Sequence, residues 1–347
     1  MAATILVVDS DPVNCATWET LLLDQRYEVF AARTGETALT VCSDLQPDLV
    51  LLSDLLPDIR GLEVCRRLKA QPRNCLTPVA LLASECEVRC TSEAIEAGVD
   101  EFLGGPTMPW EALSRVHYLL QLKAYIDDRA KSEILSLAQS IDAADVFRGG
   151  HSARVSNTAV RLGKSLGLSR NDLEALRIGG LVHDIGKIGI PGAILSKPGP
   201  LNPDESEIIR GHPILGEQIC APLKSFRDVL PLVRSHHERM NGSGYPDGLC
   251  GDEISLIVRL LQIVDICDAL TSDRSYRRAL SLPRALVVLY EEADRGWLDE
   301  ALVSQFALIT VGARGMAAIL NGGRLWSSEV MKPTESSSDK LQNLKRM

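Results

Sequence analysis

The first 122 residues alternate between short apolar runs and segments with helical spacing. Aliphatic residues dominate most of the runs, which lie at 3–9, 28–32, 48–53, 78–84 and 101–105. Apolar residues recur every three or four positions in the segments that follow the runs, at 12–25, 35–45, 62–70, 88–98 and 109–122. Continuous apolar runs are typical of strands buried on both faces, and strands that alternate with helices form parallel sheets. The pattern therefore predicts a doubly wound α/β domain with a five-stranded parallel sheet.

The chain is long enough for two domains and has an acidic charge balance. Its 347 residues carry 37 Lys and Arg against 46 Asp and Glu, a net charge of −9. This balance indicates neither nucleic acid nor an anionic membrane as a partner. The sequence has no signal-peptide pattern and no apolar stretch of the roughly 20 residues that a membrane span needs. Nine cysteines without a CxxC motif indicate reduced thiols and a cytoplasmic location.

Residues 110–145 contain neither proline nor glycine and repeat apolar residues with helical spacing. We expect one long helix or two abutting helices here. Two roles are open: a helix that transmits motion or pairs with a second copy of the chain, or one that packs within its own chain. Helical segments then continue to about residue 320 and predict an all-α helical bundle at 135–320. The polar stretch 322–347 is expected to be disordered.

Five of the six histidines lie in this second domain, at positions 151, 183, 212, 236 and 237. Asp184 follows His183 directly, and Lys187 lies four positions after His183. On an α-helix, that spacing would place the lysine over the histidine. A single helical histidine is usually a core residue, but two adjacent imidazoles and one beside a carboxylate indicate metal ligands.

Three motifs make the first domain resemble the receiver domain of bacterial response regulators: LVVD (6–9), DLVLLSDLLPDIRGLEVCRRLK (48–69) and AGVDEFLGGP (97–106). The resemblance assigns this domain to residues 1–123. It implies an acidic cluster at the carboxyl ends of the strands, where two acids hold Mg²⁺ and an aspartate accepts a phosphoryl group. A hydroxyl residue and a lysine then bind that phosphoryl group.

At four of these five receiver positions, the side chain that the phosphotransfer chemistry needs is absent. The first acid matches Asp9, but the second acid, the acceptor, the hydroxyl and the lysine fall on Ser10, Ser53, Ala83 and Gly105. Asp11 and Asp54 each stand one position away, and one step along a strand turns a side chain to the opposite face. Asp54 is therefore a poor substitute unless it lies past the strand end. We expect a domain that is not phosphorylated and serves as a spacer, a dimerisation module or a receiver held in one state.

The second domain resembles the HD-GYP family of metal-dependent phosphodiesterases that cleave cyclic di-GMP. The resemblance is carried by GHSARV (150–155), HDIGKIGIP (183–191), ILSKPGPLNPDE (194–205), HPILG (212–216), HHERMNGSGYP (236–246), YPDGLCGDEI (245–254) and DICDALTSDRSYR (265–277). It implies seven metal ligands, namely His151, His183, Asp184, His212, His236, His237 and Asp265. If Asp184 bridges two ions, these side chains make eight bonds, and positions remain for a bridging hydroxide and phosphate oxygens.

The resemblance implies two divalent transition-metal ions, with Fe or Mn favoured and Zn or Ni also compatible with imidazole and carboxylate ligands. A third ion would need a glutamate at the position of Phe147. Catalysis is expected from Asp184 and from Lys187, which would neutralise charge on the phosphoryl group.

Substrate contacts are expected from two arginines and one loop. Arg274 and Arg277 would reach the phosphates, although surface ion pairs would also explain them. Gly244 permits close backbone approach, Tyr245 could stack on a guanine or donate a hydrogen bond, and Pro246 fixes the exit of the turn. The resemblance also makes this loop a contact for diguanylate cyclase (GGDEF) partners.

The favoured function is hydrolysis of cyclic di-GMP to pGpG, and to GMP in a further step, by a hydroxide that two metal ions activate. One alternative is an HD-type phosphohydrolase for another cyclic dinucleotide such as cyclic GMP-AMP. Another is a non-catalytic module that binds a cyclic dinucleotide or a partner protein, as the altered receiver suggests. The complete ligand set and Lys187 argue for an enzyme.

Overall fold

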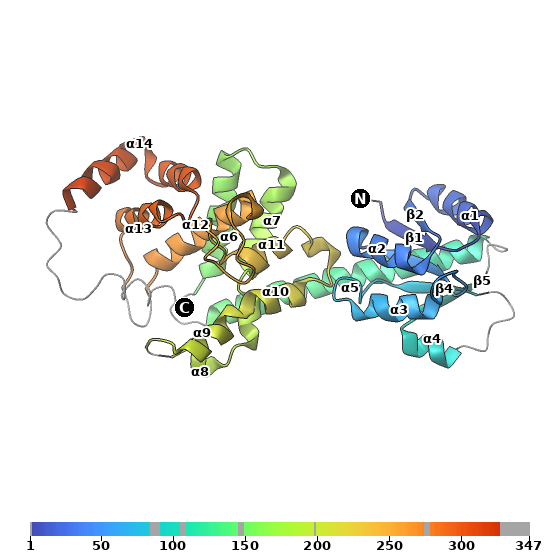
Figure 1. Cartoon of the computed structure of the whole chain (residues 1–347). Helices are drawn as coiled ribbons and strands as arrows, with labels where there is room; N and C mark the ends of the chain where they lie inside the picture. The colour runs from blue at the N-terminus through green and yellow to red at the C-terminus, as the bar shows by residue number, and fades with distance from the viewer. Residues whose placement is uncertain are drawn as a thin grey trace. The chain divides into compact units, whose positions relative to one another are not determined.

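The computed structural model describes residues 2–83, 91–104, 109–144, 149–197, 199–273 and 278–326. Contacts divide the chain into two compact units, Met1–Ser132 with Ala221–Ser225 and Glu133–Cys220 with Phe226–Met347 (Figure 1). The first unit holds a sheet and the second is helical, so the predicted fold class is confirmed.

The sheet of the first unit has five parallel strands in the order β2-β1-β3-β4-β5. The strands are β1 (Thr4–Val8), β2 (Glu28–Ala32), β3 (Leu49–Ser53), β4 (Val79–Ala83) and β5 (Glu101–Gly104). The helices between and after them are α1 (Pro12–Leu23), α2 (Gly35–Leu45), α3 (Gly61–Ala70), α4 (Thr91–Ala97) and α5 (Pro109–Ala144). The strand order reverses between β1 and β3, which is where doubly wound sheets place their functional residues.

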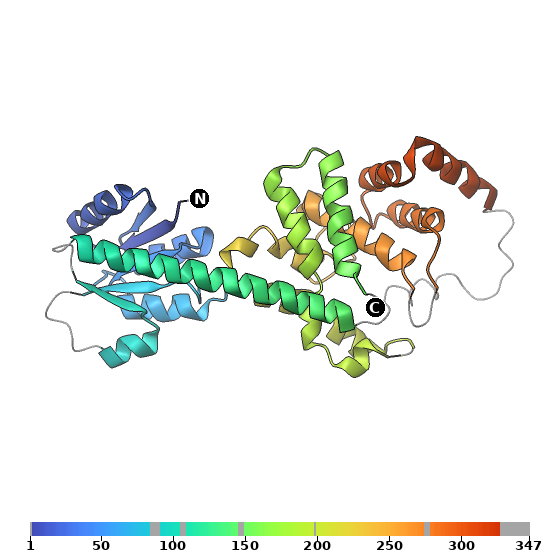
Figure 2. The same cartoon turned by 180° about the vertical axis from the view of Figure 1, so that it is seen from behind.

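Alternate residues of the central strands enter two separate cores. Ile5 and Val7 of β1 pack with Trp18 of α1 and with the start of α5, which crosses this face of the sheet in Figure 2. Leu6 and Val8 face the other way, toward apolar residues of α2 and α3. This period of two covers both faces of the sheet, as the continuous apolar runs predict.

The stretch from Pro109 to Ala144 forms one helix, α5, rather than two. Its first turns bury Ala112, Val116 and Leu119 against the sheet. No proline or glycine interrupts its interior, so backbone hydrogen bonding continues even where the sequence turns polar.

The second unit is built from helices, and most of the longer ones share one apolar core. The α-helices are α6 (His151–Ser165), α7 (Arg170–Val182), α8 (Gly192–Leu195), α9 (Pro203–Arg210), α10 (His212–Cys220), α11 (Leu230–Ser235), α12 (Leu256–Thr271), α13 (Leu282–Asp294) and α14 (Glu300–Trp326). Short 3₁₀ turns are η2 (Ile185–Gly189) and η4 (Gly251–Glu253), and the turn η3 (Lys224–Phe226) begins in residues assigned to the first unit. None of the helices in the described ranges is long and apolar enough to cross a membrane.

Helix α12 lies at the centre of this unit because it is apolar on most of its surface. Val258, Leu261 and Val264 are buried and join residues of α6, α7, α13 and α14 in the core. The few polar side chains on α12 are therefore exceptions, and two of them, Asp265 and Asp268, lead to the site.

Candidate metal centre

The structure brings together all seven side chains that the sequence analysis named as metal ligands. Their ligand atoms form two groups, each within 4.8 Å, with the members Asp184, His212, His236 and His237 in one and His151, His183 and Asp265 in the other. They come from separate elements: the starts of α6 and α10, the ends of α7 and α11, and the middle of α12. The fold thus gathers residues that lie more than a hundred positions apart in the chain.

Asp184 lies between the two groups. Its Oδ1 is 3.3 Å from His212 Nε2 and 3.8 Å from His236 Nε2. Its Oδ2 is 3.6 Å from His183 Nε2, which is in turn 3.7 Å from Asp265 Oδ1. One oxygen of Asp184 therefore faces each group, as a bridging carboxylate requires.

Backbone carbonyls set the tautomers of three imidazoles. The Nδ1 atoms of His183, His212 and His236 lie 3.1, 2.7 and 2.9 Å from the carbonyl oxygens three residues earlier. A carbonyl can only accept, so each Nδ1 carries the proton and each Nε2 presents a lone pair. Metal-binding histidines commonly have this arrangement, in which a hydrogen bond from one ring nitrogen leaves the other free to bind the metal.

The lone pairs converge in a way that fits a bound cation. His212 Nε2 and His236 Nε2 are only 3.2 Å apart, although neither carries a proton in these tautomers. His183 Nε2 is buried and has no hydrogen-bond partner among the described residues. Because a buried polar atom without a partner is costly, the residues fit divalent metal ions better than an apolar core.

The protonation states also suit metal binding. Burial lowers the pKa of His183 and His237 and brings that of His236 to about 3. Burial alone would raise the pKa of Asp184, but the Lys187 ammonium and the adjacent imidazoles hold it well below its usual range. Neutral imidazoles and an ionised carboxylate are the forms that coordinate metals.

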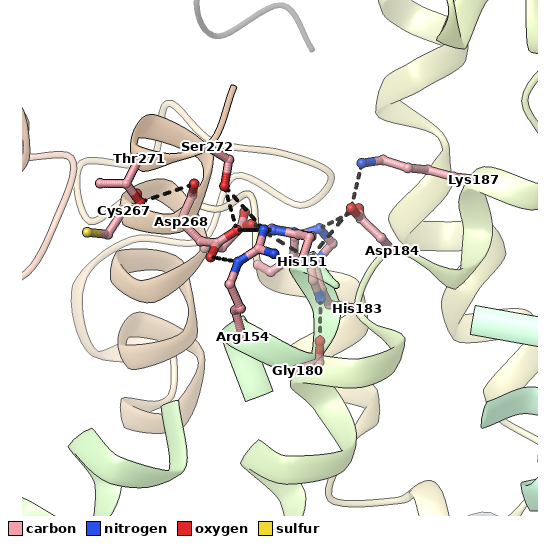
Figure 3. A network of polar contacts seen from close by, with 12 residues as sticks. His151, Arg154, Gly180, His183, Asp184, Lys187, Cys267, Asp268, Thr271 and Ser272 are labelled. Atoms are coloured by element: carbon pink, nitrogen blue, oxygen red, sulfur yellow. Dashed lines mark hydrogen bonds and ion pairs between the residues drawn. The ribbon is translucent and has the colours of Figure 1, made fainter. Parts of the chain in front are cut away.

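Lys187 does not lie where helical spacing placed it. The expectation of a lysine over His183 is wrong, because α7 ends at Val182 and residues 185–189 turn into the tighter η2. Lys187 Nζ instead lies 2.5 Å from Asp184 Oδ2 (Figure 3). The ammonium group therefore faces the Asp184 carboxylate, which lies between the two ligand groups.

Asp268 is a functional residue that the sequence analysis missed. Its Oδ2 lies 2.7 Å from His151 Nδ1, so this imidazole is held by a carboxylate instead of a carbonyl. Arg154 Nε and Nη2 donate to the same carboxylate at 2.7 and 2.9 Å, as the dashed lines in Figure 3 show. The sequence could have indicated Asp268 by its position three residues after Asp265, because residues three apart on a helix lie on the same face.

The loop after the paired histidines packs directly on the centre. The Tyr245 ring stacks on His237, with centroids 4.8 Å apart and planes at 23°. Glu238, a second residue that the sequence analysis missed, is buried and accepts hydrogen bonds from the backbone N–H groups of residues 247, 248 and 249. A Cβ on Gly244 would lie 2.4 Å from the Glu238 Cα, so glycine lets the turn reach this position. Pro246 follows Tyr245 within this loop.

At the receiver positions, the acids serve as helix caps and turn contacts. Asp9 Oδ1 accepts from the Asp11 N–H at 2.9 Å, and Asp11 Oδ1 accepts from the Val13 N–H as the cap of α1. Ser53 ends β3. Asp54 lies past the strand, where its carboxylate accepts from the Leu62 N–H at 3.1 Å and pairs with Arg60 at 2.8 Å.

Comparisons with known proteins match both units. The response regulator receiver domain matches residues 5–117, and the HD domain matches residues 136–302. The "Cyclic di-GMP phosphodiesterase response regulator RpfG" of Xanthomonas campestris is 34% identical over 74% of this chain and 74% of its own length. The chain belongs to the response regulators that carry an HD phosphodiesterase domain. It is therefore a phosphodiesterase, as the ligand set predicts.

Two proteins of Vibrio cholerae are also similar to this response regulator phosphodiesterase. A "Probable cyclic di-GMP phosphodiesterase" is 31% identical over 83% of this chain and 74% of its own length. A "3'3'-cGAMP-specific phosphodiesterase 3" is 38% identical over 46% of this chain and 34% of its own length. The names of the relatives thus include two different cyclic dinucleotides.

Several predicted positions lie outside the described residues of this phosphodiesterase. They are the substrate-contact arginines Arg274 and Arg277, the third-metal position Phe147, and the receiver position Gly105. The expectation of disorder from residue 322 is wrong for 322–326, which continue α14, and the rest of that stretch lies outside the described residues. The side chain of Ala83 is likewise outside them.

We expect Asp268→Asn to weaken metal binding about 10- to 100-fold, because an amide no longer offers His151 a charged acceptor. The ion that is lost should be the one expected at His151, His183 and Asp265. About one ion per chain would then remain after dialysis. Elemental analysis and metal titration would measure this. The matched control is Asp172→Asn, a partly exposed acid in the first turn of α7, which should leave the metal content unchanged. Equal metal content in the two variants would contradict the role of Asp268.

The receiver unit is expected to give no phosphorylation response. Ser53 cannot form an acyl phosphate, and Asp54 is engaged with Arg60 and the start of α3. Adding acetyl phosphate or beryllofluoride with Mg²⁺ should change neither intrinsic fluorescence nor phosphodiesterase rate. A saturable change that disappears in Asp54→Ala would make Asp54 the acceptor and overturn this expectation.

Proposed function

We propose that this response regulator hydrolyses cyclic di-GMP to linear pGpG, and pGpG to GMP more slowly, at a centre that holds two divalent metal ions. The observation that carries the proposal is the pair of ligand groups that share Asp184. Asp184, His212, His236 and His237 would hold one ion, and His151, His183, Asp265 and the second oxygen of Asp184 would hold the other.

When bound, two such ions would supply Lewis-acid chemistry, lowering the pKa of water and stabilising charge on phosphoryl oxygens. Five imidazoles and two carboxylates suit Fe, Mn, Zn or Ni rather than a hard cation such as Mg²⁺. The absence of thiolates among these ligands removes the softest donor class from the site.

The side chains of the centre have separate roles in the proposed hydrolysis. A water oxygen forms a new bond to phosphorus, the bond from phosphorus to the 3′ oxygen breaks, and the 3′ oxygen takes up a proton. Lys187 lies at Asp184 Oδ2, where its ammonium group can stabilise the negative charge that develops on the phosphoryl oxygens. Asp268 and the three backbone carbonyls keep the imidazole rings aimed at the centre.

A second candidate substrate is 3′3′-cyclic GMP-AMP. It is favoured by one observation, the similarity of the second unit to a phosphodiesterase named for that compound. The longer matches extend over both units and carry cyclic di-GMP in their names, so cyclic di-GMP is the first choice.

The test is a hydrolysis assay with full-length protein loaded anaerobically with Fe or Mn, against cyclic di-GMP, 3′3′-cyclic GMP-AMP and cyclic di-AMP. We expect about two ions per chain by elemental analysis and pGpG as the first product from cyclic di-GMP. Faster hydrolysis of the mixed dinucleotide would favour the second candidate. Less than one ion per chain, or a third at high occupancy, would contradict the two-ion centre.

The same proposal assigns roles to the remaining parts of the chain. Residues 1–123 would form a receiver that biases or assembles the enzyme through the helix at 110–145, and residues 135–320 would form the catalytic domain. The single uninterrupted helix α5 supports this arrangement, because a continuous helix can carry motion or pair with a second copy. The loop with Tyr245 would be the contact for GGDEF partners.

A further inference from the structure

Two arginines beside the centre form no ion pair with a carboxylate among the described residues. Arg210 ends α9, and its guanidinium carbon lies 5.1 Å from the centroid of the Tyr245 ring. Arg239 follows His237 by two positions, its guanidinium carbon lies 4.2 Å from the centroid of the Trp297 ring, and its Nη1 lies 3.3 Å from Ser243 Oγ. Both groups are thus linked to the loop that stacks on His237.

Three other arginines of this unit do form such ion pairs. Arg154, Arg234 and Arg259 each form ion pairs at 2.5–2.9 Å with aspartate or glutamate. No ion pair joins Arg210 or Arg239 to a carboxylate within the described ranges. In a chain with a net charge of −9, two such cations next to a phosphodiesterase centre indicate a site for an anion.

The surroundings of Arg239 reinforce this point. Arg239 is half-buried, and its Nη1 donates to Ser243 Oγ, two positions before Tyr245. Arg210 lies against the Tyr245 ring itself. Both guanidinium groups therefore contact the same short loop, where a single ligand can reach them.

We infer that Arg210 and Arg239 bind the phosphate of the cyclic dinucleotide that is not being cleaved. This rests on the proposed function, in which the other phosphate occupies the metal centre. A cyclic dinucleotide carries two phosphodiesters, so the second must be neutralised outside the metal ligands. A guanidinium group suits this because its planar donors match two phosphate oxygens. The site would therefore select dinucleotides over simple diesters.

The test compares a substrate that has one phosphodiester with a substrate that has two. Bis(p-nitrophenyl) phosphate has a single diester and reports on the metal centre, whereas cyclic di-GMP also needs the second subsite. Arg210→Gln and Arg239→Gln should each raise KM for cyclic di-GMP about 10- to 100-fold, the range for losing one charged hydrogen bond. The loss in kcat/KM should be at least tenfold larger for cyclic di-GMP than for the small diester. Equal losses on the two substrates, or no loss on either, would overturn the inference.

Arg295→Gln is the matched control, because Arg295 lies 5.1 Å from the same Trp297 ring but is not joined to the Tyr245 loop by any contact within the described ranges. It should leave both activities unchanged. Arg210 is exposed, so its variant should fold even if Arg239→Gln disturbs the packing at Trp297.

Equilibrium binding of cyclic di-GMP to the metal-loaded protein separates this inference from the proposed function. If wild-type protein binds cyclic di-GMP but does not cleave it, the proposed function fails, and weaker binding by both variants still supports the subsite. Unchanged binding by both variants overturns the subsite even when wild-type protein hydrolyses cyclic di-GMP.

Discussion

Asp184→Ala should lower phosphodiesterase turnover by about a thousandfold or more, because one carboxylate serves both groups of the centre. Its two oxygens face His212 and His183, respectively, at 3.3 and 3.6 Å. In the proposed two-ion centre, its removal would take a ligand from each ion and would also leave Lys187 without the carboxylate at 2.5 Å. The metal content should therefore fall as well, from about two ions per chain to one or fewer.

Tyr245→Phe provides the comparison within the same site. The phenol stacks on His237 but is not a metal ligand, so its removal should reduce turnover about tenfold or less and preserve metal content. Asp252→Ala, at a fully exposed acid in η4, is the control for loss of a surface carboxylate. Turnover of Asp184→Ala close to that of wild type would rule out the shared carboxylate as the basis of catalysis.

Gly186→Ala should disrupt the centre without replacing any ligand. A Cβ at this position would lie 1.9 Å from the His212 carbonyl oxygen and 2.6 Å from the Gly216 amide nitrogen. Both are backbone atoms of α10, so η2 would have to move away and carry Asp184 from His212. We expect a destabilisation of about 2–4 kcal/mol and at least a hundredfold loss of activity.

Gly192→Ala is the matched control for this change. It lies in the short helix α8, and a Cβ there would meet no atom within 4 Å. Thermal unfolding and elemental analysis of the two variants would separate a local clash from a general effect of replacing glycine. If Gly186→Ala unfolds and binds metal like Gly192→Ala, the close packing of η2 on α10 is not what positions Asp184.

The sequence predicted the sheet and the ligand types because both depend on local pattern. Continuous apolar runs indicate strands that are covered on both faces, and the structure has all five of them in a parallel sheet. Paired histidines and a His-Asp step indicated metal chemistry, and the motifs named seven side chains that the fold does bring together. Spacing along a helix could not place Lys187, because the helix ends one residue before the motif begins.

Only the tertiary structure showed the contacts that orient the ligands. Asp268 reaches His151 across 117 positions of the chain, and Glu238 holds a loop whose backbone amides carry no signal in the sequence. Asp54 likewise accepts a hydrogen bond from the Leu62 N–H at the start of α3, a contact that its position next to Ser53 in the sequence did not indicate. The sequence by itself therefore determined which elements form and which side chains can bind metal, since those follow from residue type and local spacing. The direction of each lone pair, the place of Asp184 between the two ligand groups and the positions of Arg210 and Arg239 at the Tyr245 loop depend on packing between distant helices, which local pattern does not encode.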